Sequence, residues 1–83
     1  MIDTLISELD LGRPQKHSLT LRGHRTSVSL EDPYWLAFVK IAQRENTPIN
    51  ELAAKIDAAR LVDAGLASAI RIFVLRWYQY HAK

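Results

Sequence analysis

The sequence predicts a mainly helical protein with one short β-ribbon. Residues 24–31 alternate between polar and apolar side chains, which is the two-residue period of a half-buried strand. After this segment, apolar residues recur at spacings of three and four in three stretches, as in amphipathic helices. The chain has 83 residues and no cysteine, so a small core must form without disulfides or thiolate metal sites. One domain completed by a second subunit fits these limits.

The predicted strand has two different faces. They carry Thr26, Val28 and Leu30 on one side, and Arg25, Ser27 and Ser29 on the other. The first set can pack on a core while the second stays outside. A guanidinium and two hydroxyls, with no acid among them, suit a surface that reads base edges. A strand face exposed only to water can have the same composition.

The segment before this strand leaves two alternatives open. Residues 18–21 also alternate, and Arg22-Gly23 suits a two-residue hairpin turn, in which Leu19 lies opposite Thr26 and Thr20 opposite Arg25. A two-stranded ribbon fits the major groove, which is about 12 Å wide, better than a broader sheet does. Either a hairpin persists, with Ser18 and Thr20 near phosphates, or residues 16–22 form a flexible basic arm.

The charge distribution is more informative than the net charge of +2. No acid occurs between residues 11 and 30, where the basic side chains are Arg13, Lys16, His17, Arg22, His24 and Arg25. Residues 64–83 are also free of acid. Such basic segments favour a nucleic-acid partner, although chance clustering in a short chain can produce them.

Three helices are expected after the strand. The first spans 33–45, with Asp32 as N-cap, and ends at Asn46 in a left-handed conformation. The second starts with Thr47 as N-cap and Pro48 as its first residue. The third spans 66–81. The apolar stripes of the first and third helices are wider than one small monomer needs, which predicts burial in a dimer. The expected dimer core is Val28, Leu30, Trp35, Phe38, Phe73 and Trp77.

The N-terminal residues 1–15 are expected to form a separate arm, with the domain covering 16–83. Within the arm, Ile2, Leu5, Ile6 and Leu9 follow the helical spacing i, i+3, i+4 and i+7. A helix this short is marginal in water, and Gly12-Arg13-Pro14 breaks it. We therefore expect an arm that docks its apolar stripe on a partner subunit.

Nothing in the sequence indicates an enzyme, a metal centre or a cofactor. The chain has no metalloprotease, phosphate-loop or nucleophile-elbow motif. His17 and His24 could approach each other across the hairpin, but two imidazoles without further ligands make an incomplete metal site. No apolar run is long enough to span a bilayer, and no basic secretory start is present. A cytoplasmic location is expected.

The strand segment reads Gly-His-Arg-Thr-Ser-Val-Ser-Leu-Glu at 23–31, and it is followed by Tyr34-Trp35, Ile41-Ala42, Asn50, Ile56-Asp57, Arg60, Ser68-Ala69, Arg71 and Phe73-Val74-Leu75. In these residues the chain resembles a small bacterial ribbon-helix-helix family. The resemblance implies an intertwined homodimer with an additional C-terminal helix. It also implies a sequence-specific DNA-binding transcriptional regulator, a repressor, that inserts an antiparallel ribbon into the major groove.

The resemblance and the charges together predict the DNA contacts. Base edges are expected to meet Arg25, Ser27 and Ser29, while phosphates meet Lys16, Arg22, His24, Thr47, Ile49 and Asn50. In the family, the second helix start grips a phosphate through free amides. Pro48 departs from the family's hydroxyl residue there and removes one amide.

A protein-interaction role is the alternative interpretation. In this view the dimer resembles an antitoxin, its ribbon is structural, and its helices or N-terminal arm bind a partner protein. The surplus apolar side chains Ile72, Leu75 and Trp77 and the modest basic charge favour it. Both roles are compatible in one protein.

Overall fold

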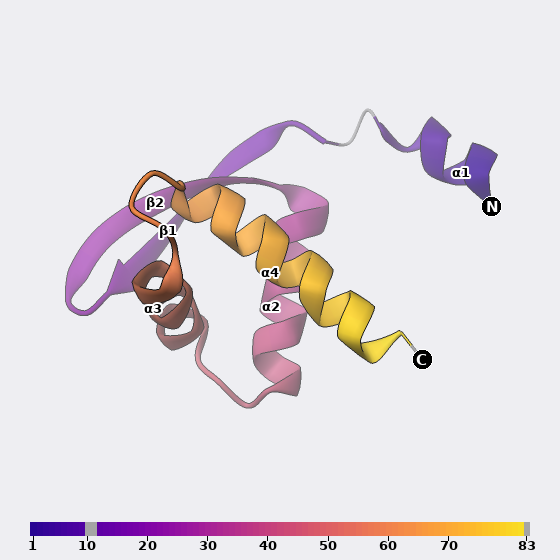
Figure 1. The fold of residues 1–83 in the computed structure, drawn as a ribbon. Helices are drawn as coiled ribbons and strands as arrows, with labels where there is room; N and C mark the ends of the chain where they lie inside the picture. The colour runs from indigo at the N-terminus through magenta and orange to yellow at the C-terminus, as the bar shows by residue number, and fades with distance from the viewer. Residues whose placement is uncertain (10–11, 83) are drawn as a thin grey trace.

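A hairpin followed by three helices forms the body of the protein (Figure 1). The computed structural model describes residues 1–9 and 12–82. Its elements are α1 (Ile2–Ser7), β1 (Pro14–Leu21), β2 (His24–Glu31), α2 (Asp32–Arg44), α3 (Ile49–Ala59) and α4 (Leu66–His81). The predicted mainly helical class is confirmed, and α4 has the bounds expected from its apolar spacing.

The hairpin resolves the choice between strand and flexible arm. β1 and β2 pair antiparallel from Pro14↔Glu31 to Leu21↔His24, and Leu19 lies opposite Thr26 as the alternation predicted. Both turn residues have positive φ, 52° at Arg22 and 84° at Gly23, as a primed two-residue turn requires. Residues 16–21 are therefore a strand, because the turn and the alternating faces of both segments agree.

The inner face of the hairpin packs on the helices. The buried core takes side chains from both strands and all three long helices: Leu19, Val28, Leu30, Phe38, Ile41, Ala42, Leu52, Ala53, Ile70 and Val74. Thr26 was expected to be buried with Val28 and Leu30, but it is exposed. It lies close to the turn, where Leu66 and Arg60 border an open hollow beneath the hairpin and leave the inner face uncovered.

Two helix starts differ from the predicted ones. α2 begins at Asp32 itself, with Glu31 as N-cap, and no side chain caps it. The predicted cap was wrong because β2 continues in extended geometry through Glu31, whose carboxylate binds Arg71 of α4. α3 begins at Ile49 with Pro48 in the N-cap position. The expected left-handed end of α2 is confirmed, since Asn46 has a φ of 51°.

The N-terminal helix α1 stands apart from this body. Figure 1 shows it extending away from the hairpin and the long helices, and none of its residues is buried. No helix within residues 1–9 and 12–82 combines the length and apolar character needed to cross a membrane.

Candidate nucleic-acid interface

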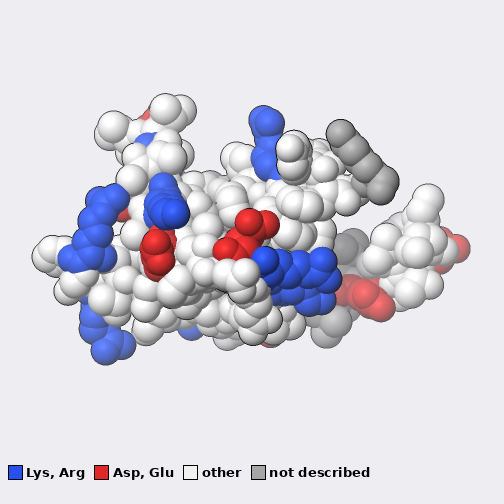
Figure 2. Space-filling view, turned by 90° about the horizontal axis from the view of Figure 1, so that it is seen from below, with Lys and Arg blue, Asp and Glu red and all other residues white. Residues whose placement is uncertain are grey.

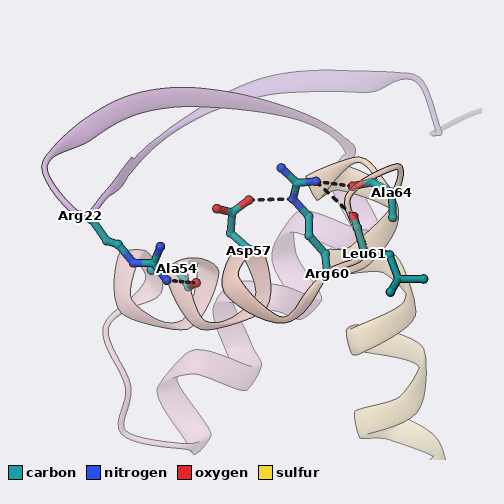
Figure 3. A network of polar contacts seen from close by, with 6 residues as sticks. All are labelled: Arg22, Ala54, Asp57, Arg60, Leu61 and Ala64. Atoms are coloured by element: carbon teal, nitrogen blue, oxygen red, sulfur yellow. Dashed lines mark hydrogen bonds and ion pairs between the residues drawn. The ribbon is translucent and has the colours of Figure 1, made fainter.

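The outer face of the hairpin is a polar surface without acids. Its cross-strand pairs, which we call the outer-face pairs, are Lys16↔Ser29, Ser18↔Ser27 and Thr20↔Arg25. All six side chains are exposed, because the helices cover only the opposite face. The hairpin arches over the helices in Figures 1 and 3. By contrast, the side seen from below carries both signs of charge, with red next to blue (Figure 2).

The two free edges of the hairpin have different neighbours. In an antiparallel pair, alternate residues direct their N–H and C=O groups away from the partner strand. The Thr20 N–H points outward from β1 and donates to Oδ1 of Asn50 at 3.0 Å, so α3 lies along this edge. Since Arg25, Ser27 and Ser29 stand opposite the outward-facing residues of β1, their backbone groups point outward from β2. Within the described chain, no strand pairs with this second edge.

The start of α3 lies beside the free edge of β1. The first backbone hydrogen bond of this helix runs from the Leu52 N–H to the Pro48 carbonyl, and no side chain caps the helix. The amides of Ile49 and Asn50 thus face outward from the helix end, where the partial positive charge favours an anion. Thr47 differs, because its N–H donates to Ala42 and its hydroxyl donates to the Glu45 carbonyl. Both donors of Thr47 are therefore engaged inside the chain.

The remaining predicted phosphate ligands lie on or near the hairpin. Lys16 is exposed on the outer face, and His24 is exposed at the turn end of β2. Arg22 is also exposed, and its Nη2 lies 3.5 Å from the carbonyl of Ala54 in α3, a long contact (Figure 3). Its guanidinium can therefore swing to another acceptor at little cost.

A model of the ribbon-helix-helix domain family matches residues 14–78. The chain belongs to this family. No curated protein and no solved structure matches the chain. Ribbon-helix-helix domains are in general dimeric, non-enzymatic DNA-binding regulators. The match starts at the first residue of β1 and ends within α4, so the hairpin and all three long helices belong to the family domain while α1 lies before it.

One ion pair joins the ribbon of this ribbon-helix-helix domain to α4. Arg71 donates through Nε to Oε1 of Glu31 at 2.9 Å and through Nη2 to Oε2 at 3.0 Å. Its Nη2 also lies 3.4 Å from the Ser29 carbonyl, and its guanidinium lies 5.9 Å from the Tyr34 ring centre. The hydrogen bonds from Arg71 lower the pKa of Glu31 below 4.5. This two-pronged bond holds the junction of β2 and α2 against the helix α4.

The histidines of the ribbon-helix-helix domain do not meet. His17 lies on the inner face and stacks on Trp35, with ring centres 4.0 Å apart and planes 8° apart. His24 is four cross-strand pairs away, at the turn. The expectation that they approach each other was wrong, because the antiparallel register places His17 opposite Val28 and not opposite His24.

The predicted dimer-core residues fall into two groups. Val28, Leu30 and Phe38 are enclosed within one chain. Trp35, Phe73 and Trp77 are partly buried at the border of the core, and Trp77 donates from Nε1 to a carboxylate oxygen of Glu45 at 2.9 Å. Burial of this second group by another subunit stays a prediction.

Sequence reasoning missed the long-range bonds that support the ribbon. Neither the Glu31–Arg71 pair nor the Thr20–Asn50 bond has a sequence signal, because the partners are 40 and 30 residues apart. The nearest hint was the acid-free composition of residues 64–83, which left Arg71 without a partner on its own helix.

Proposed function

We propose that two copies of this chain pair through the free edges of β2 and place the outer face of the joined sheet in the DNA major groove. The observation that carries this proposal is the acid-free outer face of the hairpin, whose β1 edge lies beside the uncapped start of α3. In the pairing we propose, Ser27 lies opposite the partner's Ser27, and Arg25 lies opposite the partner's Ser29. All three residues direct backbone groups outward, as a two-fold antiparallel ladder needs. The Ser29 carbonyl also has a long contact with Arg71, but its second lone pair can accept a bond from the partner strand.

The in-chain hairpin changes how such a dimer meets DNA. Joining two hairpins makes a four-stranded sheet in the order β1, β2, partner β2, partner β1. Neighbouring strands lie about 4.8 Å apart, so the outer strand axes are separated by roughly 14 Å. The major groove is about 12 Å wide. The two central β2 strands therefore enter the groove, while each β1 strand lies against a sugar-phosphate backbone.

This arrangement assigns roles to the outer-face pairs. Arg25, near the centre of the sheet, is suited to donate two hydrogen bonds to guanine O6 and N7, which discriminate by about 1–3 kcal/mol per contact. Ser27 and Ser29 accept or donate to several bases and add less selectivity. On β1, Lys16, Ser18 and Thr20 supply phosphate contacts.

The α3 start and the turn complete the phosphate contacts. The amides of Ile49 and Asn50 offer an anion site next to Thr20. Asn50 is held in place because its side chain accepts the Thr20 N–H. Arg22 reaches a more distant phosphate from the turn. His24 can reach one only around the strand edge, because its side chain shares the inner side of β2 with Thr26. A dimer seated in this way excludes other proteins from the same site, and repression is the direct consequence.

Loss of Arg25 tests this function. A site is first selected from a random duplex pool with the full chain, and affinity is then measured by fluorescence anisotropy. Arg25→Ala should weaken binding to the selected site by roughly 10-fold or more, as expected for about 1–3 kcal/mol per lost bidentate contact, with the dimer intact. Arg44→Ala is the matched control, because Arg44 is exposed at the far end of α2.

Two results would contradict the proposal. Equal affinities of Arg25→Ala and the unchanged chain would remove this residue from base recognition. No binding to any duplex at low salt would remove DNA altogether and leave the protein-interaction role.

A further inference from the structure

An apolar groove runs between α3 and α4. The α3–α4 groove has a volume of about 370 Å³. Its apolar lining consists of Ile56, Ala59, Leu61, Ala64, Ala69, Ile72 and Phe73. Ile72 is 59% exposed although it belongs to the longest helix, so one chain leaves this surface open to water. An apolar groove of this kind on a small domain indicates a binding surface.

The loop beside the groove is held in place by Arg60 (Figure 3). Arg60 donates from Nε to Oδ1 of Asp57 at 2.7 Å and from Nη1 to the Ala64 carbonyl at 2.6 Å. These bonds tie the end of α3 to the end of the loop. The aliphatic side chains of Leu61 and Val62 are left 73% and 101% exposed. The loop therefore extends the apolar surface and does so in a fixed conformation.

The arm of the same chain carries a matching apolar surface without a partner. Ile2, Leu5, Ile6 and Leu9 form one stripe, and their exposed fractions lie between 56% and 72%. Asp3 lies beside the stripe, away from its centre. A helix of six residues is not stable alone in water, so its apolar stripe needs a surface to cover it.

We propose that the α3–α4 groove binds α1 of a second copy of this chain. Charge favours this occupant, because the arm carries Asp3 and Glu8 while α4 contains no acid and has Arg76 one helical turn beyond the groove residue Ile72. The arm then adds contacts between subunits beyond those of the ribbon. This pairing is independent of DNA binding.

Reach favours the arm of a second copy over the arm of the same chain. The arm joins β1 at Pro14, the open end of the hairpin, whereas Arg60 of the groove lies with Leu21 beneath the turn end. The length of β1 corresponds to roughly 23 Å at about 3.3 Å per residue. The link from Leu9 to Pro14 has five residue steps and can span about 18 Å at most. Figure 1 likewise shows α1 and the loop between α3 and α4 at opposite sides of the molecule.

Cysteine crosslinking tests the proposal directly, because the chain has no cysteine of its own. One population carries Ile6→Cys in the apolar stripe, and a second, longer tagged population carries Ala69→Cys in the groove. The two are mixed under mild oxidation, and the mixed disulfide is followed by gel mobility. Thr4→Cys is the matched control, since Thr4 lies opposite the stripe on α1. Circular dichroism of each variant verifies that it is folded.

A mixed disulfide that forms several-fold faster with Ile6→Cys than with Thr4→Cys supports the proposal. Adding Ile72→Asp to the tagged chain should then abolish this difference, because a carboxylate enters the apolar groove. Equal rates for Ile6→Cys and Thr4→Cys overturn the proposal. It is also overturned if a chain with both Ile6→Cys and Ala69→Cys forms only an internal disulfide, since the arm then occupies its own groove.

Discussion

At the scale of single residues, Arg22 holds a conformation that its side chain does not favour. Its φ is 52°, and a left-handed residue with a Cβ costs roughly 1–2 kcal/mol. Asparagine adopts this conformation more easily and is preferred at the first position of such turns. Backbone strain of this kind is often found where a side chain serves binding. The guanidinium of Arg22, with only a long bond to Ala54, fits that description.

Arg22→Asn should therefore stabilise the protein and weaken its binding to DNA. We expect a gain of up to about 1 kcal/mol in the free energy of unfolding, measured by urea denaturation, because the turn strain is relieved. Affinity for the selected duplex should fall, because one phosphate contact is lost. Arg22→Lys separates the two effects: it keeps the charge and the strain, so neither quantity should change much. Higher stability with unchanged affinity would remove Arg22 from the DNA contacts.

The bond between Glu31 and Arg71 makes stability depend on pH. The pKa of Glu31 in the folded chain is lowered from 4.5, chiefly by the hydrogen bonds from Arg71. A lowered folded-state pKa stabilises the protein above pH 4.5, and this contribution is lost as the pH falls through the folded value. Both side chains are about a quarter exposed, 29% and 24%, so the effect is modest.

Thermal melts of Glu31→Gln at several pH values measure this contribution. The unchanged chain should melt at a higher temperature than Glu31→Gln at pH 7, and the gap should close as the pH falls below 4.5. Asp63→Asn in the exposed loop between α3 and α4 is the control and should show no comparable gap. A gap that persists undiminished at low pH would mean that Glu31 stabilises the fold by packing and not by its charge.

At the scale of elements, the hairpin combines a local signal with long-range support. The turn, the facing of Leu19 and Thr26, and the bounds of α4 were all predictable, because each depends on residues close together in the chain. The choice between strand and flexible arm was not, because the edge of β1 is held by Asn50. The exposure of Thr26 depends on where the helices end beneath the hairpin. No local sequence pattern predicts this position.

The free edge of β2 can be blocked without disturbing the pairing inside the hairpin. Ser27→Pro removes an outward N–H and should raise the dissociation constant of the dimer by about tenfold or more, since two central hydrogen bonds of roughly 1 kcal/mol each are lost. Sedimentation equilibrium measures this constant. Ser18→Pro is the matched control, because Ser18 faces Ser27 and its N–H points to the opposite edge. Equal dimerisation of both variants would place the dimer contact elsewhere.

At the scale of the whole molecule, the outer face of the hairpin carries basic groups and no acid, whereas the rest of the surface carries both signs of charge. This distribution predicts a salt dependence that the net charge of +2 does not reveal. Each neutralised phosphate adds a slope of about −0.9 to the plot of log K against log salt concentration. The candidate site was only partly predictable from the sequence. The composition located the basic segment, but the fold decides which of its side chains share a face.

Lys16→Ala should reduce the magnitude of this salt slope. With two copies bound, the loss is expected to be about 2, and binding should weaken similarly for selected and unrelated duplexes. Binding titrations at several salt concentrations measure the slope. Lys40→Ala is the control, because Lys40 is exposed on α2 and away from the ribbon. A change confined to the selected duplex would move Lys16 from phosphate contact to base recognition.

The register of the hairpin has a consequence for the DNA sequence that the proposed dimer recognises. If the two-fold axis passes through Ser27, Arg25 and the partner's Arg25 are four residues apart along the central strands, or roughly 14 Å at about 3.4 Å per residue. Base pairs repeat at about 3.4 Å along each DNA strand. The selected sequence should then be an inverted repeat whose two guanines, one on each strand, are spaced by about four base pairs.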